Sequence, residues 1–295
     1  SSSFRNYLQG VLGDKSAQPN ASASTMTQAP VSVPANHTDQ AAISSVLGAL
    51  DDKIELNRKM NATLEKMARA LFRDWFVDFG PTRAKMEGRE PYLSADLWSL
   101  FPEQLDESAG LPVGWTLSSL GKHSMNFDSK RVPLSGPQRS QQPGPYPYHG
   151  ATGVMDRVAK FLFDGTYLLV GEDGSVEREN GLAFTQYVSG KIWVTNHAHV
   201  LQGKAPVSTE QLLLYFDHEV VGPYITGAVQ LKLSQGRMNS MPFVDAGAAV
   251  SEKFGHLVSP LFKRVLANRA EAAALAETRD YLLPKLMSGE VTLRE

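Results

Sequence analysis

Residues 39–78 read DQAAISSVLGALDDKIELNRKMNATLEKMARALFRDWFVD, and this stretch decides the fold. It contains no proline and a single glycine, and the pair Gly80-Pro81 follows it. Asp39 is a good helix N-cap and a Gly-Pro pair stops a helix, so we predict one long helix. Five side chains recur every seven residues, the spacing of a coiled-coil seam: Ile43, Leu50, Asn57, Leu64 and Leu71. We expect the companion side chains three residues beyond seam positions to share the buried face: Val46, Met60 and Met67.

The C-terminal part of the chain repeats this pattern. Five further side chains are spaced by seven, each 211 positions after its counterpart: Phe254, Leu261, Asn268, Leu275 and Leu282. Both runs carry an asparagine at the same seam position, and a buried asparagine selects one helix register at a cost in stability. We therefore predict that residues 39–78 and 249–287 are two long helices packed antiparallel. One alternative stays open, in which each helix is amphipathic and packs on a globular core.

Three other segments differ in composition from these helices. Residues 13–38 are rich in turn-forming residues, and a shift of 212 aligns Met26 with Met238 and Pro30 with Pro242. Residues 79–110 are an irregular acidic linker with a short helix expected around 93–100. Residues 111–247 alternate short apolar runs with glycine-marked turns, which indicates a mixed domain. We expect strands at 161–163, 167–171, 191–195 and 199–201 and helices near 209–216 and 220–226. The expected fold class is α+β, one mixed domain plus two long helices.

Composition excludes several classes of protein. The chain has 295 residues, of which 42% are hydrophobic and 20% charged, and this balance is typical of a globular protein. We expect no membrane span and no secretory signal, because no apolar run reaches about 18 residues and no charged leader precedes one. The chain has no cysteine, which excludes disulfides and thiol catalysis and fits a cytoplasmic location. Its net charge is −2, so binding of nucleic acid would rest on a local patch.

The motifs of common enzyme sites are missing from the sequence. The glycine turns at 150–153 and 171–174 do not continue into Gly-Lys-Ser/Thr, and no dinucleotide fingerprint is present. His197 and His199 would point to one face of a strand and could bind a metal with His149 or Asp173, but we favour ordinary polar contacts. Glu172 and Asp173 occupy an acidic turn of a common kind. We therefore expect no catalytic residues, no metal and no cofactor on this chain.

Several stretches resemble the specificity subunits of type I restriction–modification systems. The central conserved region of that family is similar to LDDKIELNR (50–58), LFRDWFVDF (71–79) and RAKMEG (83–88). Its target recognition domains are similar to LPVGW (111–115), YHGATG (148–153), LLVGEDGS (168–175) and WVTNHAHVL (193–201). Its distal conserved tail resembles RDYLLPKLMSGE (279–290). The resemblance covers residues 39–295 in order.

The resemblance implies a domain plan. It assigns residues 39–78 to the central conserved helix, 79–110 to a linker, 111–247 to one complete target recognition domain and 248–295 to the distal conserved helix and tail. Residues 1–38 then resemble the tail of a preceding, incomplete recognition domain. Two interpretations stay open, a piece of a two-domain subunit and a half-length subunit that pairs with a second copy or with another half.

The resemblance also implies a function without catalysis. In that family, two recognition domains each read half of a split site in double-stranded DNA, and two antiparallel helices set their separation. The subunit docks methyltransferase subunits, which use S-adenosylmethionine, and through them the restriction subunits, which use ATP and Mg²⁺. Two alternatives from other classes remain, namely a coiled-coil adaptor whose α+β domain binds protein and a recognition domain from a fused restriction–methylation enzyme.

Residue types within 111–247 suggest where DNA would bind. Lysine and arginine neutralise phosphates, amide and imidazole groups read base edges, and glycine turns let backbone amides approach the DNA backbone. The expected DNA-contacting residues are Lys130, Arg131, Tyr148, His149, Gly150, Thr152, Arg157, Gly171, Asp173, Ser175, Asn196, His197, Lys232, Gln235 and Arg237. The segment holds 11 basic and 11 acidic residues, so we expect few phosphate contacts. From charge alone, an ordinary solvated surface is the alternative.

Overall fold

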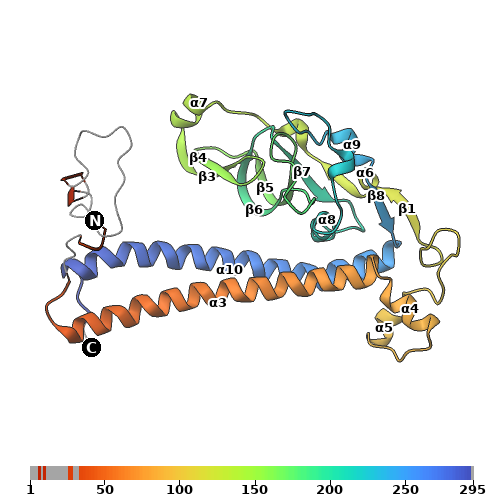
Figure 1. Ribbon diagram of the computed structural model, residues 1–295, viewed down its shortest axis with the longest axis horizontal. Coiled ribbons are helices and arrows are strands. Elements are labelled where there is room, and N and C mark those ends of the chain that lie inside the picture. The colour runs from red at the N-terminus through yellow and green to blue at the C-terminus, as the bar shows by residue number, and fades with distance from the viewer. Residues whose placement is uncertain (1–5, 8, 11–25, 29–32, 294–295) are drawn as a thin grey trace. The chain divides into compact units, whose positions relative to one another are not determined.

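The computed structural model describes residues 6–7, 9–10, 26–28 and 33–293 of the chain (Figure 1). The chain divides into two compact units, residues 1–61 with 267–295 and residues 62–266. Both long helices contribute to both units. The predicted recognition-domain tail at residues 1–38 lies mostly outside the described residues.

The two long helices are present and antiparallel, as predicted. They are α3 (His37–Phe76) and α10 (Ala248–Ser288), drawn in orange and blue in Figure 1. In the first unit, Arg279 Nη1 lies 2.6 Å from Asp51 Oδ1 and Asn57 Nδ2 donates to Glu271 Oε2 at 2.9 Å. Asn268 Nδ2 donates to Asn61 Oδ1 at 2.8 Å. The residue numbers of the partners decrease along α10 as they increase along α3, so the two helices are antiparallel.

All ten predicted seam positions are buried or half-buried, and Asn57 and Asn268 are 0% and 1% exposed. The predicted companions need correction, because Val46 and Met67 are exposed and Met60 is only half-buried. The buried companions lie four residues beyond the seam positions instead: Ile54, Ala68, Trp75, Val258, Val265 and Leu286. A heptad alternates steps of three and four, and the seven-residue spacing alone does not say which step comes first.

The linker is more ordered than the sequence indicated. It contains α4 (Gly80–Met86) and α5 (Ala95–Trp98), and α3 is separated from α4 by Phe79, which has a left-handed backbone with φ 52°. Aromatic rings pack the linker into the second unit, to which it belongs, with the Phe101 ring 4.8 Å from that of Trp75 and the Phe79 ring 5.8 Å from that of Trp115.

The mixed domain contains two sheets. A two-stranded antiparallel sheet pairs β1 (Thr116–Ser119) with β8 (Pro242–Asp245) and so joins the two ends of the segment 111–247. A six-stranded sheet has the order β2-β7-β5-β6-β3-β4, and only its β3–β6 pair is parallel. Its strands are β2 (Ser124–Asn126), β3 (Pro143–His149), β4 (Val154–Val158), β5 (Phe163–Gly171), β6 (Thr185–Val194) and β7 (Ala198–Gly203). The α+β fold class is thereby confirmed.

Short helices connect and cover these strands. They are α6 (Leu120–His123), α7 (Gly136–Ser140), α8 (Thr209–Phe216) and α9 (Gln235–Asn239), with 3₁₀ turns at Asp128–Lys130 and Gly222–Tyr224. The helix predicted at 209–216 is confirmed. The helix predicted at 220–226 is wrong, because Gly222-Pro223 limits that segment to the 3₁₀ turn. None of the described helices combines the length and apolarity needed to cross a membrane.

One hydrophobic core joins the helices and the mixed domain within the second unit. Ring centroids of Phe72, Trp75 and Phe76 lie 4.9–6.0 Å from that of Phe254. The same buried cluster includes Leu212 and Phe216 of α8 and Leu168 of β5. The mixed domain is therefore built directly on the C-terminal part of α3 and the N-terminal part of α10.

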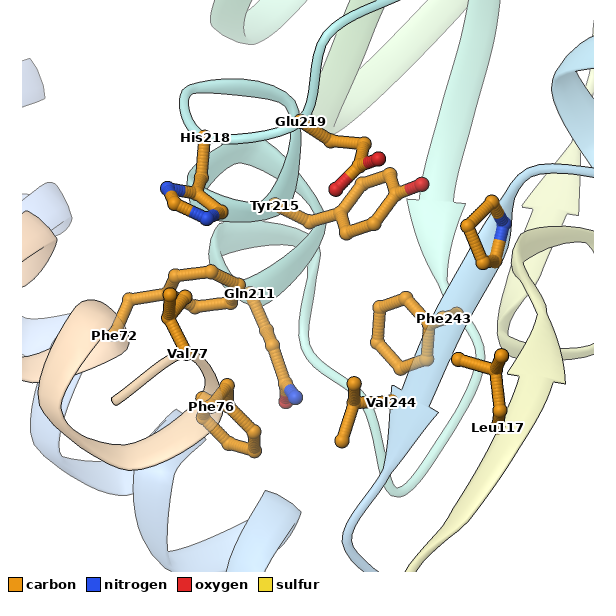
Figure 2. Close-up of a pocket in the computed structure, with 11 residues that line it drawn as sticks. Phe72, Phe76, Val77, Leu117, Gln211, Tyr215, His218, Glu219, Phe243 and Val244 are labelled. Atoms are coloured by element: carbon orange, nitrogen blue, oxygen red, sulfur yellow. The ribbon is translucent and has the colours of Figure 1, made fainter. Parts of the chain in front are cut away.

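A small apolar cavity of about 250 Å³ opens beside this core (Figure 2). Its walls come from α3, α8, β1 and β8, and they include Phe72, Phe76, Phe243 and Val244. Figure 2 shows the Gln211 amide of α8 pointing between Phe76 and Val244. The cavity shares no lining residue with the glycine turns singled out in the sequence.

Candidate nucleic-acid interface

Four loops of the mixed domain are held together by direct hydrogen bonds, and we call them the loop cluster: residues 128–131, 171–175, 195–197 and 226–233. Glu172 N donates to His197 O at 2.9 Å, and Gly174 N donates to Leu231 O at 2.9 Å. Leu233 N donates to Glu172 O at 2.9 Å. All four loops contain residues that the sequence analysis selected for DNA contact.

A bend in the sheet brings the glycine turn at 150–153 toward the loop cluster. Gly165 of β5 and Gly190 of β6 are directly paired, and both have positive φ, 143° and 91°. Glycine adopts such angles without strain, so the β5–β6 ribbon can bend here. The two ends of β6 consequently meet the same turn: Val194 pairs with His149, while Gln186 Nε2 donates to Gly150 O at 2.8 Å. Thr195 N completes the link by donating to His149 O at 3.0 Å.

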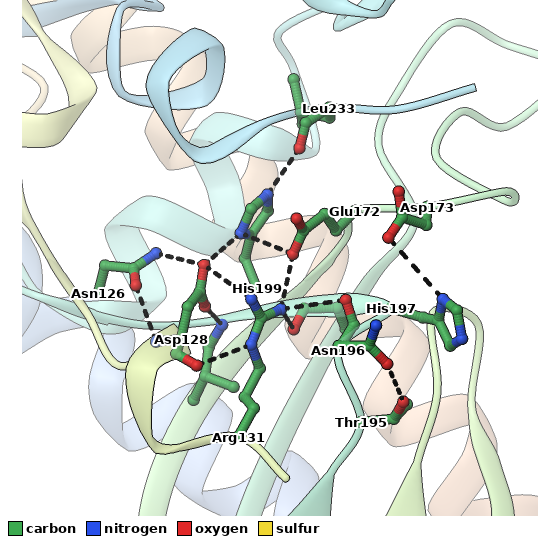
Figure 3. Close-up of polar contacts among 12 residues, drawn as sticks. Asn126, Asp128, Arg131, Glu172, Asp173, Thr195, Asn196, His197, His199 and Leu233 are labelled. Atoms are coloured by element: carbon green, nitrogen blue, oxygen red, sulfur yellow. Dashed lines mark hydrogen bonds and ion pairs between the residues drawn. The ribbon is translucent and has the colours of Figure 1, made fainter. Parts of the chain in front are cut away.

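Beneath the loops lie four charged side chains, which we call the buried ion cluster: Asp128, Arg131, Glu172 and His199 (Figure 3). Arg131 Nη1 donates to Glu172 Oε2 at 2.7 Å and to Ala198 O at 2.6 Å. The Arg131 side chain is 11% exposed. One guanidinium therefore ties the loops 128–131, 171–175 and 195–197 together.

Both ring nitrogens of His199 have hydrogen-bond partners. Its Nε2 lies 2.7 Å from Leu233 O, and its Nδ1 lies 2.5 Å from Asp128 Oδ2. Each ring nitrogen of His199 therefore faces an oxygen acceptor, one from a carboxylate and one from a backbone carbonyl. Burial alone would raise the pKa of Asp128, but the hydrogen bonds from His199, Val200 N and Asn126 outweigh it and lower that pKa. Arg131, His199 and the partly exposed Lys232 thus surround the carboxylates of Asp128 and Glu172.

A metal site is not favoured in the buried ion cluster. Asp128, Glu172 and His199 offer three ligand atoms within 4.8 Å of one another. The Arg131 guanidinium and the His199 ring already bond to those carboxylates. The sequence suggestion that His197 and His199 share one face is wrong, since His197 is exposed in a turn and His199 is fully buried in β7.

Burial corrects part of the predicted DNA-contacting set. Tyr148 is 1% exposed and its hydroxyl bonds to the Leu134 backbone, so its side chain belongs to the core. Arg131 serves the buried ion cluster, and His149 is buried against Gln186. The amides of Gly150 and Gly171 already donate to Gly153 O and Phe184 O, both at 2.8 Å, so they do not serve DNA phosphates. These glycines instead allow tight turns.

The remaining predicted residues lie on the surface. Arg157 lies within β4, where its Nη1 donates to Pro145 O at 2.6 Å, and it has no hydrogen bond or ion pair to the loop cluster among the described residues. Asp173 is half-buried and pairs with Lys232 at 3.3 Å. The exposed candidates in or beside the loops are Lys130, Thr152, Ser175, Asn196, His197, Lys232, Gln235 and Arg237.

Sequence reasoning missed three contributors to this region. Gln186 links β6 to the turn at 150–151, Asp128 anchors Val200 N at 2.8 Å, and the loop 226–232 reaches the Gly174 turn. None belongs to a recognisable motif. Their roles depend on which strands pair, and only Lys232 of the loop 226–232 was selected from residue type.

The buried imidazole of His149 predicts a pH dependence of stability. Burial lowers its pKa, so the folded state binds a proton there less readily than the unfolded chain, whose histidine pKa is about 6.5. Its contribution is therefore present above about pH 6.5 and is lost as the pH falls below that value. We expect the melting temperature to fall between pH 7 and 5, and to fall less steeply in His149→Gln. If the melting temperatures of the wild type and of His149→Gln fell equally with pH, this assignment would be contradicted. Burial also lowers the pKa of His123, but His123 is present in both proteins and so does not contribute to the difference between them.

No protein-family model matches the chain. The chain is 25% identical to the type I restriction enzyme MjaIX specificity subunit of Methanocaldococcus jannaschii, over 98% of this chain and 66% of the relative. It is 24% identical to the HindI specificity subunit of Haemophilus influenzae, over 88% of this chain and 69% of the relative. The chain thus spans about two thirds of the length of these relatives.

A solved structure has the same fold. The crystal structure of the type I restriction-modification system S subunit from M. genitalium superposes with a TM-score of 0.52 at 17% identity, covering 96% of this chain and 72% of that chain. Fold and sequence therefore agree with the motifs in residues 39–295: the chain resembles the specificity subunits of type I restriction–modification systems.

Proposed function

We propose that this chain is a DNA-specificity subunit of a type I restriction–modification complex. The likeness to named specificity subunits over 98% of the chain carries the proposal. In this role, residues 111–247 bind one half of a bipartite site in double-stranded DNA. The long helices dock methyltransferase subunits, and restriction subunits join through them. S-adenosylmethionine, ATP and Mg²⁺ belong to those partners, and this chain is non-catalytic.

The surface of the mixed domain supports DNA recognition by a limited set of contacts. Exposed amide, hydroxyl and cationic side chains gather at the loop cluster, including Asn196, Ser175 and Lys130. Lys232 Nζ lies 3.3 Å from both Glu172 and Asp173, so part of its charge is already balanced. Few free cations remain for phosphates. We therefore expect weak binding by the chain alone and stronger binding when methyltransferase subunits add their own contacts.

A selection experiment tests the proposal. The full chain, alone and with the methyltransferase subunit of its system, is incubated with random-sequence duplex DNA, and the bound fraction is sequenced. We expect enrichment of one short motif in the complex. Binding without sequence preference would contradict the proposal, as would capture of DNA that does not depend on this chain. Methyl transfer or cleavage by the chain alone would contradict its non-catalytic role.

Lys130 provides a prediction about phosphate contact. Its side chain is exposed at the loop cluster and its ammonium lies 5.2 Å from the centre of the Phe127 ring, with no carboxylate partner among the described residues. We expect Lys130→Ala to weaken binding to all sequences alike and to reduce the slope of log K against log salt by about 0.9. Titrations at several salt concentrations measure this.

The matched control is Lys204→Ala. Lys204 is also exposed but follows the end of β7 opposite to the loop cluster. It should leave both affinity and salt slope unchanged. Equal effects of the two substitutions would place the DNA elsewhere on the domain.

A further inference from the structure

A short hairpin projects from the loop cluster, and we call it the 226–232 hairpin. Thr226 N donates to Lys232 O at 2.9 Å, and Lys232 N donates to Thr226 O at 2.8 Å. Between them, Gly227 has φ 92°, and a Cβ added there would lie 2.2 Å from Gln230 O. The hairpin is therefore a five-residue loop, 227–231, closed by a single bridge, and it requires glycine at position 227.

The tip carries a fully exposed apolar side chain. Val229 is 101% exposed, whereas the next most exposed large apolar side chain among the described residues, Leu117, is 65% exposed. Val229 buries no surface in the folded chain, so it contributes nothing to the core. Single exposed apolar residues are common on protein surfaces. This one is distinguished by its position, in the middle of the loop that the Thr226–Lys232 bridge closes.

The base of the hairpin is fixed to the candidate interface. Leu231 O accepts from Gly174 N at 2.9 Å. Two residues further along, Leu233 O lies 2.7 Å from His199 Nε2 and accepts a hydrogen bond from it. Lys232 Nζ lies between Glu172 and Asp173, at 3.3 Å from each. Backbone hydrogen bonds and ion pairs therefore hold the 226–232 hairpin to the loops above the buried ion cluster. Because it is held in this way, the hairpin is oriented before it meets a ligand.

We propose that Val229 contacts the 5-methyl group of a thymine in the major groove and so determines one base of the DNA target. The major groove is wide enough for a two-stranded ribbon or a helix and so for a narrow loop, and thymine is the base that presents a methyl group there. Gln230 and Lys232 of the hairpin and Gln235 and Arg237 of the following helix α9 are exposed and suit contacts with phosphates and neighbouring bases. The apolar surface at the tip is small, since only Ala228 and Leu231 are exposed beside Val229, and it fits one methyl group better than it fits an apolar protein patch. This inference rests on the proposed function and assigns a residue to it.

Replacing thymine by uracil tests the contact, because uracil lacks only the methyl group. The selected DNA site is prepared with each thymine replaced in turn, and binding by the full chain with its methyltransferase subunit is titrated. At one thymine we expect a loss of affinity of about fourfold, the value of one buried methyl group. Val229→Ala should bind the thymine and uracil sites equally, with its melting temperature unchanged because Val229 buries no surface.

Val113→Ala is the matched control, since Val113 is also exposed but precedes β1, away from the hairpin. It should keep the full uracil effect. The inference is overturned if specific binding persists but no thymine is sensitive, or if Val229→Ala keeps the uracil effect. It is also overturned if Val229→Ala instead weakens assembly with the methyltransferase subunit. Loss of all sequence preference in the wild type would overturn the proposed function as well, so the two failures are distinguishable.

Discussion

Phe254→Ala is expected to lower the free energy of unfolding by about 3–5 kcal/mol, the usual cost of deleting a fully buried ring. Phe254 is 0% exposed, and its ring lies 4.9 Å from that of Phe76 and 5.6 Å from that of Trp75. These rings belong to the core that joins α3, α10 and the mixed domain in the second unit. The cavity left behind would be lined by rigid aromatic rings that cannot easily fill it. Urea unfolding of the full chain, followed by tryptophan fluorescence, measures the change.

Leu257→Ala is the control for this prediction. Leu257 lies less than one turn further along α10 and is 39% exposed, so its truncation should cost less than about 1 kcal/mol. Because Trp75 contacts Phe254 directly, its fluorescence reports on the core itself. Equal costs for the two substitutions would show that the mixed domain is not built on this face of α10.

Local periodicity explains why the helices could be predicted from sequence. The residues of α3 and α10 lie on one face through their spacing alone, so the seam from Ile43 to Leu282 required no knowledge of partners. Whether the second buried side chain lies three or four residues beyond each seam position did depend on the partner helix. Met67 is 54% exposed and Ala68 is fully buried, and the larger apolar residue was the natural but wrong choice from sequence. Close packing of two helices favours the small side chain at that point.

The candidate interface was only partly predictable for a different reason. The glycine turns could be found from their residues, but their neighbours depend on the bend at Gly165 and Gly190 and on strand pairing far apart in sequence. Prolines 143, 145 and 147 concealed β3, because proline is rare inside strands. Lys130 and Arg131 look equivalent in the sequence, yet one is exposed and the other is enclosed by Asp128 and Glu172. Residue type identified both as cations, but only the fold separates their roles.

Arg131→Ala should therefore destabilise the domain, by about 3–5 kcal/mol, because it breaks a buried ion pair and leaves Glu172 with only the longer contacts to His199 and to the partly exposed Lys232. Arg131 loses contacts to Glu172 at 2.7 Å and Ala198 O at 2.6 Å, and no water-exposed group can replace them easily. Arg131→Lys should recover only part of the loss, since an ammonium cannot reproduce the fork of the guanidinium. Urea unfolding gives the free energies, and amide exchange at residues 171–175 and 195–197 should accelerate in Arg131→Ala.

A double-mutant cycle separates this role from simple loss of packing. Arg131→Ala combined with Glu172→Ala removes one charge of each sign, so the pair should cost less than the sum of the two single substitutions. Lys130→Ala, at the adjacent position, should change the free energy of unfolding by less than about 0.5 kcal/mol while weakening DNA binding. If the cycle were additive and Arg131→Ala as mild as Lys130→Ala, then Arg131 would act at the surface, as its sequence position first suggested. The opposite result makes Arg131 the residue that holds the loops, including the base of the 226–232 hairpin, in the geometry that DNA would meet.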